Sequence, residues 1–419
     1  MDMPRILLAD ADAFFVAVAR AVDPEGAGRA ALLIVGGRPG SRGVVCSASY
    51  ETRAYGVRSA MPIGQALKLC PDAMCVPVPR YACADTSRAI RSALDQFTPL
   101  VEGASIDEWY LDMSGTEALY DHEPLEVTAR RIRSAVFEAT GMNVSIGGGS
   151  SKLIAKLAVE RGKPSRDPLA GGVHIVPDGT ELDFMRTVAL ADIPGIGPKQ
   201  QTKLLAVGLT MAADVLTHDM RTLERWLGAT SAAWLYDRVR GISHASVEPR
   251  LPAKQMSREE TFDRDIADAV ALSSELRHLS AKVAADLRAD GLDARTITVK
   301  LRTNDFTTRS AGKTFDEPVE SDRAIIDTAD ALLKQLRAEY PRPARLVGVS
   351  LSNLKPARDA RQLTMFDGAT KPEGTPEGER DRELSRALDR VREKFGDDAI
   401  RAGPKRRSAI GEKGARKPR

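Results

Sequence analysis

Apolar residues along the first 172 positions follow two different periods. Short apolar runs, typical of buried strands, alternate with segments whose apolar residues recur about every three to four positions, as on one face of a helix. A strand predicted over residues 6–9 ends at Asp10, and a helix predicted over residues 125–140 ends at Gly141, a typical C-cap. Further strands are predicted over 31–35, 44–46 and 144–146, and further helices over 14–22, 65–70, 84–97 and 151–161. This alternation favours an α/β or α+β core.

The rest of the chain changes character several times. Several short helices are predicted after residue 172, followed by a linker containing Pro, Ser and His. A long helix is predicted over 266–287, and Ile297, Val299 and Leu301 then alternate with polar residues as in a half-buried strand. Apolar content falls beyond residue 355, so we expect a mostly disordered tail that includes residues 371–382. The segments are 1–172, 173–241, the linker 242–255, 256–355 and the tail 356–419.

Composition narrows the class of protein. A hydrophobic fraction of 42% is enough for packed cores, which excludes a wholly disordered chain. No apolar stretch reaches the roughly 18 residues of a membrane span, and no signal-peptide pattern opens the sequence. The four Cys form no C-x-x-C pair and the five His are scattered, which argues against zinc and against a disulfide framework. We therefore expect a cytoplasmic protein with reduced thiols and no membrane partner.

The net charge of +3 is unevenly distributed. Residues 401–419 contain eight Lys or Arg against one Glu, a charge of +7, so the other 400 residues sum to −4. Whole-chain charge thus gives little reason to expect nucleic acid as a partner, and any such partner must be argued from local features.

Acidic residues stand at two strand ends. Asp10 and Asp12 follow the first strand, and Asp107 and Glu108 occupy a turn where two strand pieces are expected to meet. Adjacent carboxylates repel one another unless a cation neutralises them, and Mg²⁺ prefers such oxygen ligands. Two such ions can serve an in-line phosphoryl displacement. On spacing alone, solvated turns are the favoured explanation of these acids.

Four motifs occur together in one order. They are D-A-D-A-F-F at 10–15, S-A-S-Y-E-T-R-A-Y-G-V-R-S-A-M-P at 47–62, S-I-D-E at 105–108, and S-S-K-L-I-A-K-L-A at 150–158 with K-P at 163–164. Their order and intervals resemble the Y-family translesion DNA polymerases, specifically the DNA polymerase IV group, over residues 1–366. The resemblance implies a right-hand α+β polymerase. Its parts are palm and fingers over 1–172 (fingers 18–77), a thumb over 173–241 and an α/β little-finger domain over 256–355.

The resemblance also implies the catalytic residues. Asp10, Asp107 and Glu108 are the expected metal ligands, assisted by the Ala11 carbonyl, with two Mg²⁺ per active site. Catalysis would then rest on positioning and charge neutralisation.

Five residues are expected to contact the incoming nucleotide by the same resemblance. Ser47, Tyr50 and Arg53 would hold the triphosphate, and Lys163 would reach it from the other side. Phe15 matches the steric gate, a ring that excludes a 2′-hydroxyl, whereas Phe14 is expected in the core.

The chain departs from the family pattern at a few positions. Trp109 stands where Ala is usual after S-I-D-E, and residues 147–149 are unusually rich in Gly. Ser151 and Glu160 replace the more common Asn and Asp. None of these changes removes an expected metal ligand.

The loop P-G-I-G-P-K at 194–199 resembles a helix-hairpin-helix. Gly195 and Gly197 permit tight turns that aim amide groups at a DNA phosphate, and Lys199 adds a charge. Alone, the pattern fits a simple αα-hairpin equally well. Its place in the family's thumb favours DNA binding.

Residues 295–313 carry a local charge of +4. Lys300, Arg302 and Arg309 are the cations expected to follow a phosphate backbone without reading bases. A merely solvated sheet face is the alternative, and the family's little-finger domain favours DNA contact.

The apolar island at 362–366, Q-L-T-M-F, resembles the pentapeptide that docks bacterial polymerases on the sliding clamp. Leu363, Met365 and Phe366 would fill a hydrophobic pocket while Gln362 hydrogen-bonds.

We therefore expect a monomeric, template-directed, low-fidelity DNA polymerase that acts on primer–template DNA and dNTPs without proofreading. A catalytically inactive polymerase-like scaffold for clamp and partner binding in mutagenesis is one alternative, which the complete acidic set disfavours. A Mg²⁺-dependent nucleotide cyclase could share the core but explains neither the 194–199 loop nor the 362–366 motif.

Overall fold

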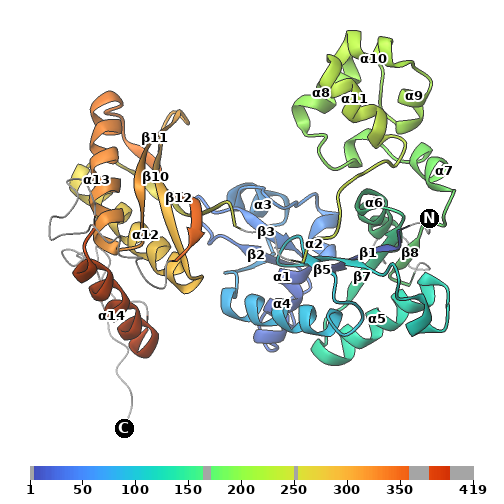
Figure 1. The fold of residues 1–419 in the computed structure, drawn as a ribbon, viewed down its shortest axis with the longest axis horizontal. Helices are drawn as coiled ribbons and strands as arrows, with labels where there is room; N and C mark the ends of the chain where they lie inside the picture. The colour runs from blue at the N-terminus through green and yellow to red at the C-terminus, as the bar shows by residue number, and fades with distance from the viewer. Residues whose placement is uncertain (1–3, 164–170, 250–252, 358–376, 397–419) are drawn as a thin grey trace, which may run out of the picture. The chain divides into compact units, whose positions relative to one another are not determined.

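The structure is a computed structural model that describes residues 4–163, 171–249, 253–357 and 377–396 (Figure 1). It is an α+β protein, as expected, and divides into two compact units, Met1–Leu251 and Pro252–Arg419. Within the described residues, no helix is long and apolar enough to cross a membrane. The two units are described separately.

The first unit is built on a five-stranded sheet of order β5-β6-β1-β7-β8. The central strand β1 (Ile6–Ala11) is antiparallel to β6 and to β7, and all six of its residues are buried. The other strands are β5 (Val101–Gly103), β6 (Glu108–Asp112), β7 (Val144–Gly149) and β8 (Val173–Ile175).

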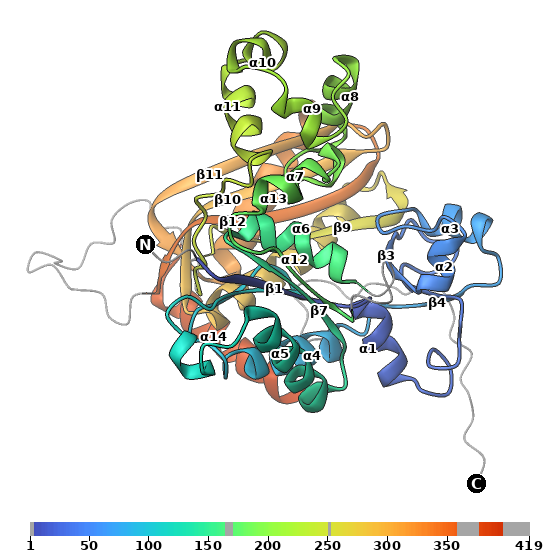
Figure 2. The same ribbon diagram turned by 90° about the vertical axis from the view of Figure 1, so that its right-hand side faces the viewer.

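The two faces of this sheet pack on different helices. Leu7, Ala9 and Ala11 join the core formed with α4 (Arg80–Leu94) and α5 (Leu125–Thr140). Ile6 and Leu8 pack against Ala155 and Val159 of α6 (Lys152–Gly162). Figure 2 shows α6 on one side of β1 and α4 and α5 on the other. Because side chains alternate along a strand, Asp10 shares the α6 face with Ile6 and Leu8.

The Gly-rich stretch of β7 brings α6 unusually close to the sheet. A Cβ on Gly147 would lie 2.1 Å from the Val159 amide nitrogen and 2.3 Å from the Ala155 carbonyl oxygen. Only glycine fits where a helix backbone rests on a strand. This contact gives a physical reason for the glycine at position 147.

Trp109 lies on the opposite face from Asp10. Its side chain is 2% exposed and belongs to the core with Leu7 and Leu111. The indole therefore packs beneath the acidic turn, away from α6.

A smaller sheet of order β3-β2-β4 follows α1 (Phe14–Val22) in the first unit. Its strands are β2 (Leu33–Gly36), β3 (Val45–Ala48) and β4 (Met74–Val76), and its helices are α2 (Tyr50–Ala54) and α3 (Ile63–Leu69). Ile34, Val45 and Ile63 form its core. The unit ends in a helical region with α7 (Glu181–Arg186), α8 (Pro198–Ala206), α9 (Ala212–Leu216), α10 (Met220–Leu227) and α11 (Ala229–Arg238).

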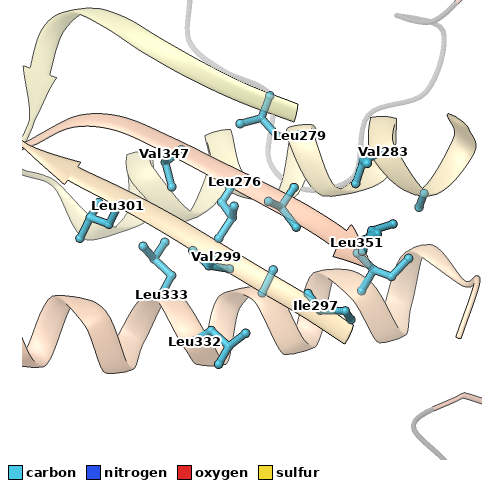
Figure 3. Close-up of a cluster of buried hydrophobic side chains, with 14 of the residues drawn as sticks. Leu276, Leu279, Val283, Ile297, Val299, Leu301, Leu332, Leu333, Val347 and Leu351 are labelled. Atoms are coloured by element: carbon cyan, nitrogen blue, oxygen red, sulfur yellow. The ribbon is translucent and has the colours of Figure 1, made fainter. Parts of the chain in front are cut away.

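The second unit is an antiparallel sheet of order β11-β10-β12-β9, covered on one face by α12 and α13. The predicted alternation is confirmed, since Ile297, Val299 and Leu301 are buried against these helices (Figure 3). The elements are β9 (Gln255–Ile266), α12 (Ala269–Ala289), β10 (Leu292–Thr303), β11 (Thr308–Val319), α13 (Asp322–Glu339) and β12 (Ala344–Pro356).

A further helix, α14 (Glu379–Phe395), packs beside α13 in the second unit (Figure 1). Our expectation of disorder for this part of the tail is wrong over residues 377–396, while residues 371–376 lie outside the described residues. The prediction failed because the attachment is polar. The Arg288 guanidinium, only 5% exposed, donates to both Asp389 carboxylate oxygens at 2.6 and 2.9 Å and to Asp322 at 2.8 Å.

Other contacts complete the attachment of α14. The Ser385 hydroxyl accepts the Asp322 amide at 3.0 Å, and the Glu377 carboxylate accepts the Ser321 amide at 2.7 Å. Arg386 donates to the Glu320 carboxylate at 2.8 Å. A helix with little apolar surface is thus held by charge-assisted hydrogen bonds.

Candidate active site

The site begins with two carboxylates placed opposite each other. Asp10 at the end of β1 is paired in register with Glu108 at the start of β6, so both side chains lie on the α6 face. The Ala11 amide donates to the Asp107 carbonyl at 2.9 Å, which fixes the acidic turn against the strand end. The structure thus brings together two of the three expected metal ligands, Asp10 and Glu108.

Two lysines reach these carboxylates from α6 and its end. Lys163, the C-cap of α6, donates to Asp10 Oδ2 at 3.1 Å and to Glu160 at 2.6 Å. Lys156 donates to Glu108 Oε1, and its Nζ lies 4.0 Å from Asp10 Oδ2. The acidic pair thus faces a matching pair of cations.

Burial raises the pKa of Asp10 from 3.8 to about 6, because a charged carboxylate is poorly solvated inside the sheet. Lys163 opposes this rise, whereas the neighbouring Glu108 adds to it. Burial also works against the charge of Lys163, but Asp10 and Glu160 outweigh it and raise the pKa of that amine. The site therefore concentrates negative charge in a poorly solvated place, as a cation site requires.

Asp107 is not turned toward the other two acids. Its carboxylate accepts the Ser105 hydroxyl at 2.5 Å, and among the described residues no three Asp, Glu, His or Cys side chains are grouped closely enough to hold a metal ion. The donor set is nevertheless all oxygen, which fits a hard divalent cation.

Three of the expected nucleotide contacts, Ser47, Tyr50 and Arg53, form a cluster of their own. Arg53 donates to the Ala48 carbonyl at 2.9 Å and to the buried Ser47 hydroxyl at 3.4 Å, and its guanidinium lies 5.1 Å from the centre of the Tyr50 ring. Ser49 caps α2 by accepting the Thr52 amide, which holds the helix start in place.

A cavity of about 340 Å³ connects this cluster to the start of α1. Tyr50 lines it together with Ala13, whose backbone is left-handed at φ 45°. The turn at Ala13 lets α1 start directly after the acidic strand. Phe14 is 2% exposed in the core, as expected, and Phe15 is half-buried with its ring 5.5 Å from Phe14.

Asp12 has a different environment from Asp10. Its carboxylate accepts the Ser145 hydroxyl at 2.8 Å, and burial raises its pKa. It lines the same cavity as Arg133, a cation that the motifs did not indicate.

Family models match most of the chain. The impB/mucB/samB family matches residues 9–160, and the C-terminal domain of the same family matches residues 253–365. A curated relative, DNA polymerase IV of Dehalococcoides mccartyi (strain CBDB1), is 35% identical over 96% of this chain and 98% of its own. The chain belongs to the Y-family DNA polymerases, in the DNA polymerase IV group. It is therefore a DNA-directed DNA polymerase, and this family uses divalent metal ions.

Solved structures agree with this assignment. A Y-family chimera, Dbh-Dpo4(243-245)-Dbh, is 26% identical and superposes with a TM-score of 0.73 over 83% of the polymerase and 98% of that chain. An insertion ternary complex of Dbh DNA polymerase, also 26% identical, gives a TM-score of 0.58 over 83% of the polymerase and 98% of that chain.

The predicted thumb loop of the polymerase lies before α8. Gly195 has a left-handed φ of 101°, and a Cβ there would lie 2.8 Å from the Trp234 ring. Gly197 is the N-cap of α8, and Lys199 in its first turn is exposed. The loop therefore presents a helix start and a lysine to solvent.

The predicted DNA-binding cations of the second unit do not all share one face. Lys300 pairs in register with Ser310, and Arg302 with Thr308, on the face not covered by α12 and α13. Arg309 pairs with the buried Leu301, so it lies toward the helices, 5.0 Å from the Tyr340 ring. Lys300 also forms an ion pair with Glu259 at 2.6 Å. The clamp motif at 362–366 lies outside the described residues.

Sequence reasoning missed Lys156 of the polymerase. Its motif was noted, but no role was assigned to it. The spacing of Lys152, Lys156 and Lys163 by four and seven residues could have shown that they lie on one side of α6.

Proposed function

We propose that the polymerase carries out template-directed, low-fidelity translesion synthesis without proofreading, with two Mg²⁺ in its active site. The observation that carries this proposal is the in-register pair Asp10 and Glu108 at the strand ends of β1 and β6. Paired acids in a poorly solvated site suit metal-assisted phosphoryl transfer.

Asp10, Asp107 and Glu108 would hold the ions with help from the Ala11 carbonyl. When bound, Mg²⁺ would activate the primer 3′-hydroxyl and neutralise charge on the α-phosphate and leaving group. The protein side chains position the partners around that step. Arg53 and Lys163 are oriented by hydrogen bonds and would draw the triphosphate against Tyr50.

The primary test is primer extension with purified protein and a panel of damaged templates. Asp107→Ala is the informative variant, because that carboxylate accepts the Ser105 hydroxyl in the structure. We expect incorporation opposite lesions by the wild type and none by the variant. Full activity of the variant would remove Asp107 from the metal site. An inactive wild type would favour the scaffold alternative.

Phe15 would act as the steric gate against ribonucleotides. Its half-buried ring at the start of α1 is braced by Phe14, so it can present a fixed edge to a sugar. Phe15→Leu should raise ribonucleotide incorporation at least about tenfold by removing that edge. Phe184→Leu, which trims a ring in α7 instead, is the control and should leave sugar selection unchanged.

DNA is the proposed partner of the thumb loop and of the open face of the second unit. The similar Dbh DNA polymerase has a solved structure described as an insertion ternary complex. This similarity supports DNA and dNTP binding by the polymerase. The double variant Lys300→Glu, Arg302→Glu should weaken primer–template binding. It should also reduce the slope of log affinity against log salt concentration by about two. Arg309→Glu is the control, since Arg309 lies on the other face. Unchanged affinity in the double variant would exclude this face.

The sliding clamp is the proposed partner of residues 362–366. Deleting them should spare distributive synthesis and abolish stimulation by the clamp, because the anchors Leu363 and Phe366 are lost. Equal stimulation of both forms would contradict the assignment.

We also propose a monomer that acts in the cytoplasm. The four Cys are free in the structure, which suits a reducing compartment. Sedimentation velocity of the full chain measures the oligomeric state, and extension of a mismatched primer end without excision tests the absence of proofreading.

A further inference from the structure

Helix α6 directs three lysines at three different carboxylates. Lys152 donates to Glu102 at 2.6 and 2.7 Å, Lys156 donates to Glu108, and Lys163 donates to Asp10. The lysines share one side of the helix because they are spaced by four and seven residues. Gly147 lets the helix lie against β7, which brings all three amines within reach of the strands.

The first of these ion pairs is structural. Glu102 is 8% exposed and also accepts the Glu248 amide at 2.8 Å, and the Lys152 amine lies 4.6 Å from the centre of the Tyr110 ring. These partners engage both oxygens of Glu102, so the pair ties the chain after α11 to the sheet.

The Lys156 pair is built differently. The side chains of Lys156 and Glu108 are 26% and 25% exposed, and the lysine touches only one oxygen of Glu108 while its Nζ stays 4.0 Å from Asp10. A flexible, partly solvated ammonium can leave such a position at small cost. A divalent cation at the acidic pair would draw on the same Glu108 carboxylate charge, so the two cations compete for it.

We propose that Lys156 is an exchangeable counter-ion of the metal site: it neutralises Glu108 and Asp10 and weakens divalent-cation binding by competing for Glu108. The inference rests on the proposed function, which assigns Glu108 as a metal ligand. It makes Lys156 a positioning residue, one that holds the acidic pair in place and sets the cation concentration at which the site fills.

The test measures Mn²⁺ binding to the intact chain by electron paramagnetic resonance, without DNA or nucleotide. Lys156→Met keeps the length of the side chain and removes its charge. We expect its Kd for Mn²⁺ to fall about fivefold, the size of one partly exposed ion pair. Lys156→Arg restores the charge and should return the Kd to that of the wild type.

Lys152→Met is the matched control, because it removes an equal charge from the same helix face but its partner is Glu102. It should leave the Kd for Mn²⁺ within about twofold of the wild type, since Lys152 is paired with Glu102 and not with the acidic pair. An equal fall of the Kd for Mn²⁺ in both variants would show that only net charge matters and would overturn the proposal. An unchanged or higher Kd in Lys156→Met would overturn it too. If Lys156→Met fails to fold, Lys156→Gln serves in the same comparison.

Glu108→Gln separates this proposal from the proposed function. If Glu108→Gln leaves Mn²⁺ binding unchanged, Glu108 is not a ligand and both proposals fail. If Glu108→Gln weakens binding while Lys156→Met does not tighten it, only the counter-ion role fails. In the Glu108→Gln background, Lys156→Met should change the Kd much less than in the wild type, because the shared carboxylate charge is gone.

Discussion

Each unit of the polymerase places acidic and basic side chains together in a poorly solvated position. The two clusters differ in how their charges are paired and in what the pairing does. In the first unit, Asp10 and Glu108 face each other and are held by lysine amines through few contacts. In the second unit, Arg288 is 5% exposed and makes three hydrogen bonds to Asp322 and Asp389. The first cluster sets two carboxylates side by side with lysines at their edge, whereas the second surrounds one arginine with carboxylates.

The difference shows that charge burial alone does not identify a functional site. A guanidinium bonded on several sides by carboxylates has no capacity for a ligand, and its value is structural. Carboxylates pressed together at a strand end keep oxygens that a cation can use, and the strain of their repulsion is relieved when it binds. The balance and exchangeability of the contacts distinguish the two cases.

The sharpest way to break the comparison is to neutralise one charge in the first cluster. Asp10→Asn should lower single-turnover nucleotide incorporation about a thousandfold or more, because several kcal/mol of metal-ion stabilisation is lost. Asp112→Asn, on β6 but bonded to the Ser114 amide, is the control and should stay within about threefold of the wild type. Retention of a tenth of the activity by Asp10→Asn would place the metal site elsewhere.

The corresponding change in the second cluster should affect stability. Arg288→Met leaves Asp322 and Asp389 without their central partner and should destabilise the second unit by about 3–5 kcal/mol. Hydrogen exchange of α12 and α13 measures this. Arg258→Met, which breaks a half-exposed pair with Asp286, should cost less than about 1 kcal/mol. Similar costs for the two variants would contradict the structural role of Arg288.

The pH dependence of stability should reveal the buried carboxylate of Asp10 in the first cluster. Burial raises the pKa of Asp10 to about 6 from 3.8, so the folded state binds more protons than the unfolded state between these values. Stability therefore falls as pH rises through this window, by about 3 kcal/mol in total, and no further above it. Without divalent cations, Asp10→Asn should be more stable than the wild type at pH 7 and equal to it at pH 4. Urea unfolding followed by tryptophan fluorescence measures this, since Trp109 lies in the same sheet. A less stable variant at pH 7 would reverse the sign assigned to Asp10.

The smallest expected change in stability concerns the glycine that positions α6 beside the first cluster. Gly147→Ala should cost about 1–3 kcal/mol, because the new methyl group meets the α6 backbone and pushes the lysine-bearing helix outward. Gly103→Ala is the control, since its Cβ would make an ordinary 3.9 Å contact with Trp109. Thermal unfolding of both variants checks the difference, and equal melting temperatures would show that α6 can adjust.

Much of the fold follows from local pattern. The predicted helix over 125–140 with its C-cap matches α5 and Gly141, whose φ is 69°. The alternation of Ile297, Val299 and Leu301 sets the face of β10. These predictions succeed because periodicity and capping are properties of short segments.

Other features depend on information that no short segment holds. The face of Arg309 depends on the register between β10 and β11, which one residue of shift would reverse. Helix α14 has apolar residues at helical spacing, but its docking rests on Arg288, Glu320 and Asp322, far away in the sequence. The acids of the site were found from their motifs, whereas the partnership of Lys156 with Glu108 needed the packing of α6 on the sheet.

The attachment of α14 makes the helix a ligand that its own chain carries. Because the helix is joined covalently to the unit that it binds, even a weak intrinsic affinity keeps it bound. A separate peptide of residues 377–396 should then bind, with modest affinity, to a polymerase that ends before residue 377, and high salt should release it, because the contacts are ionic. In this sense the second unit holds a receptor site and its occupant in one chain.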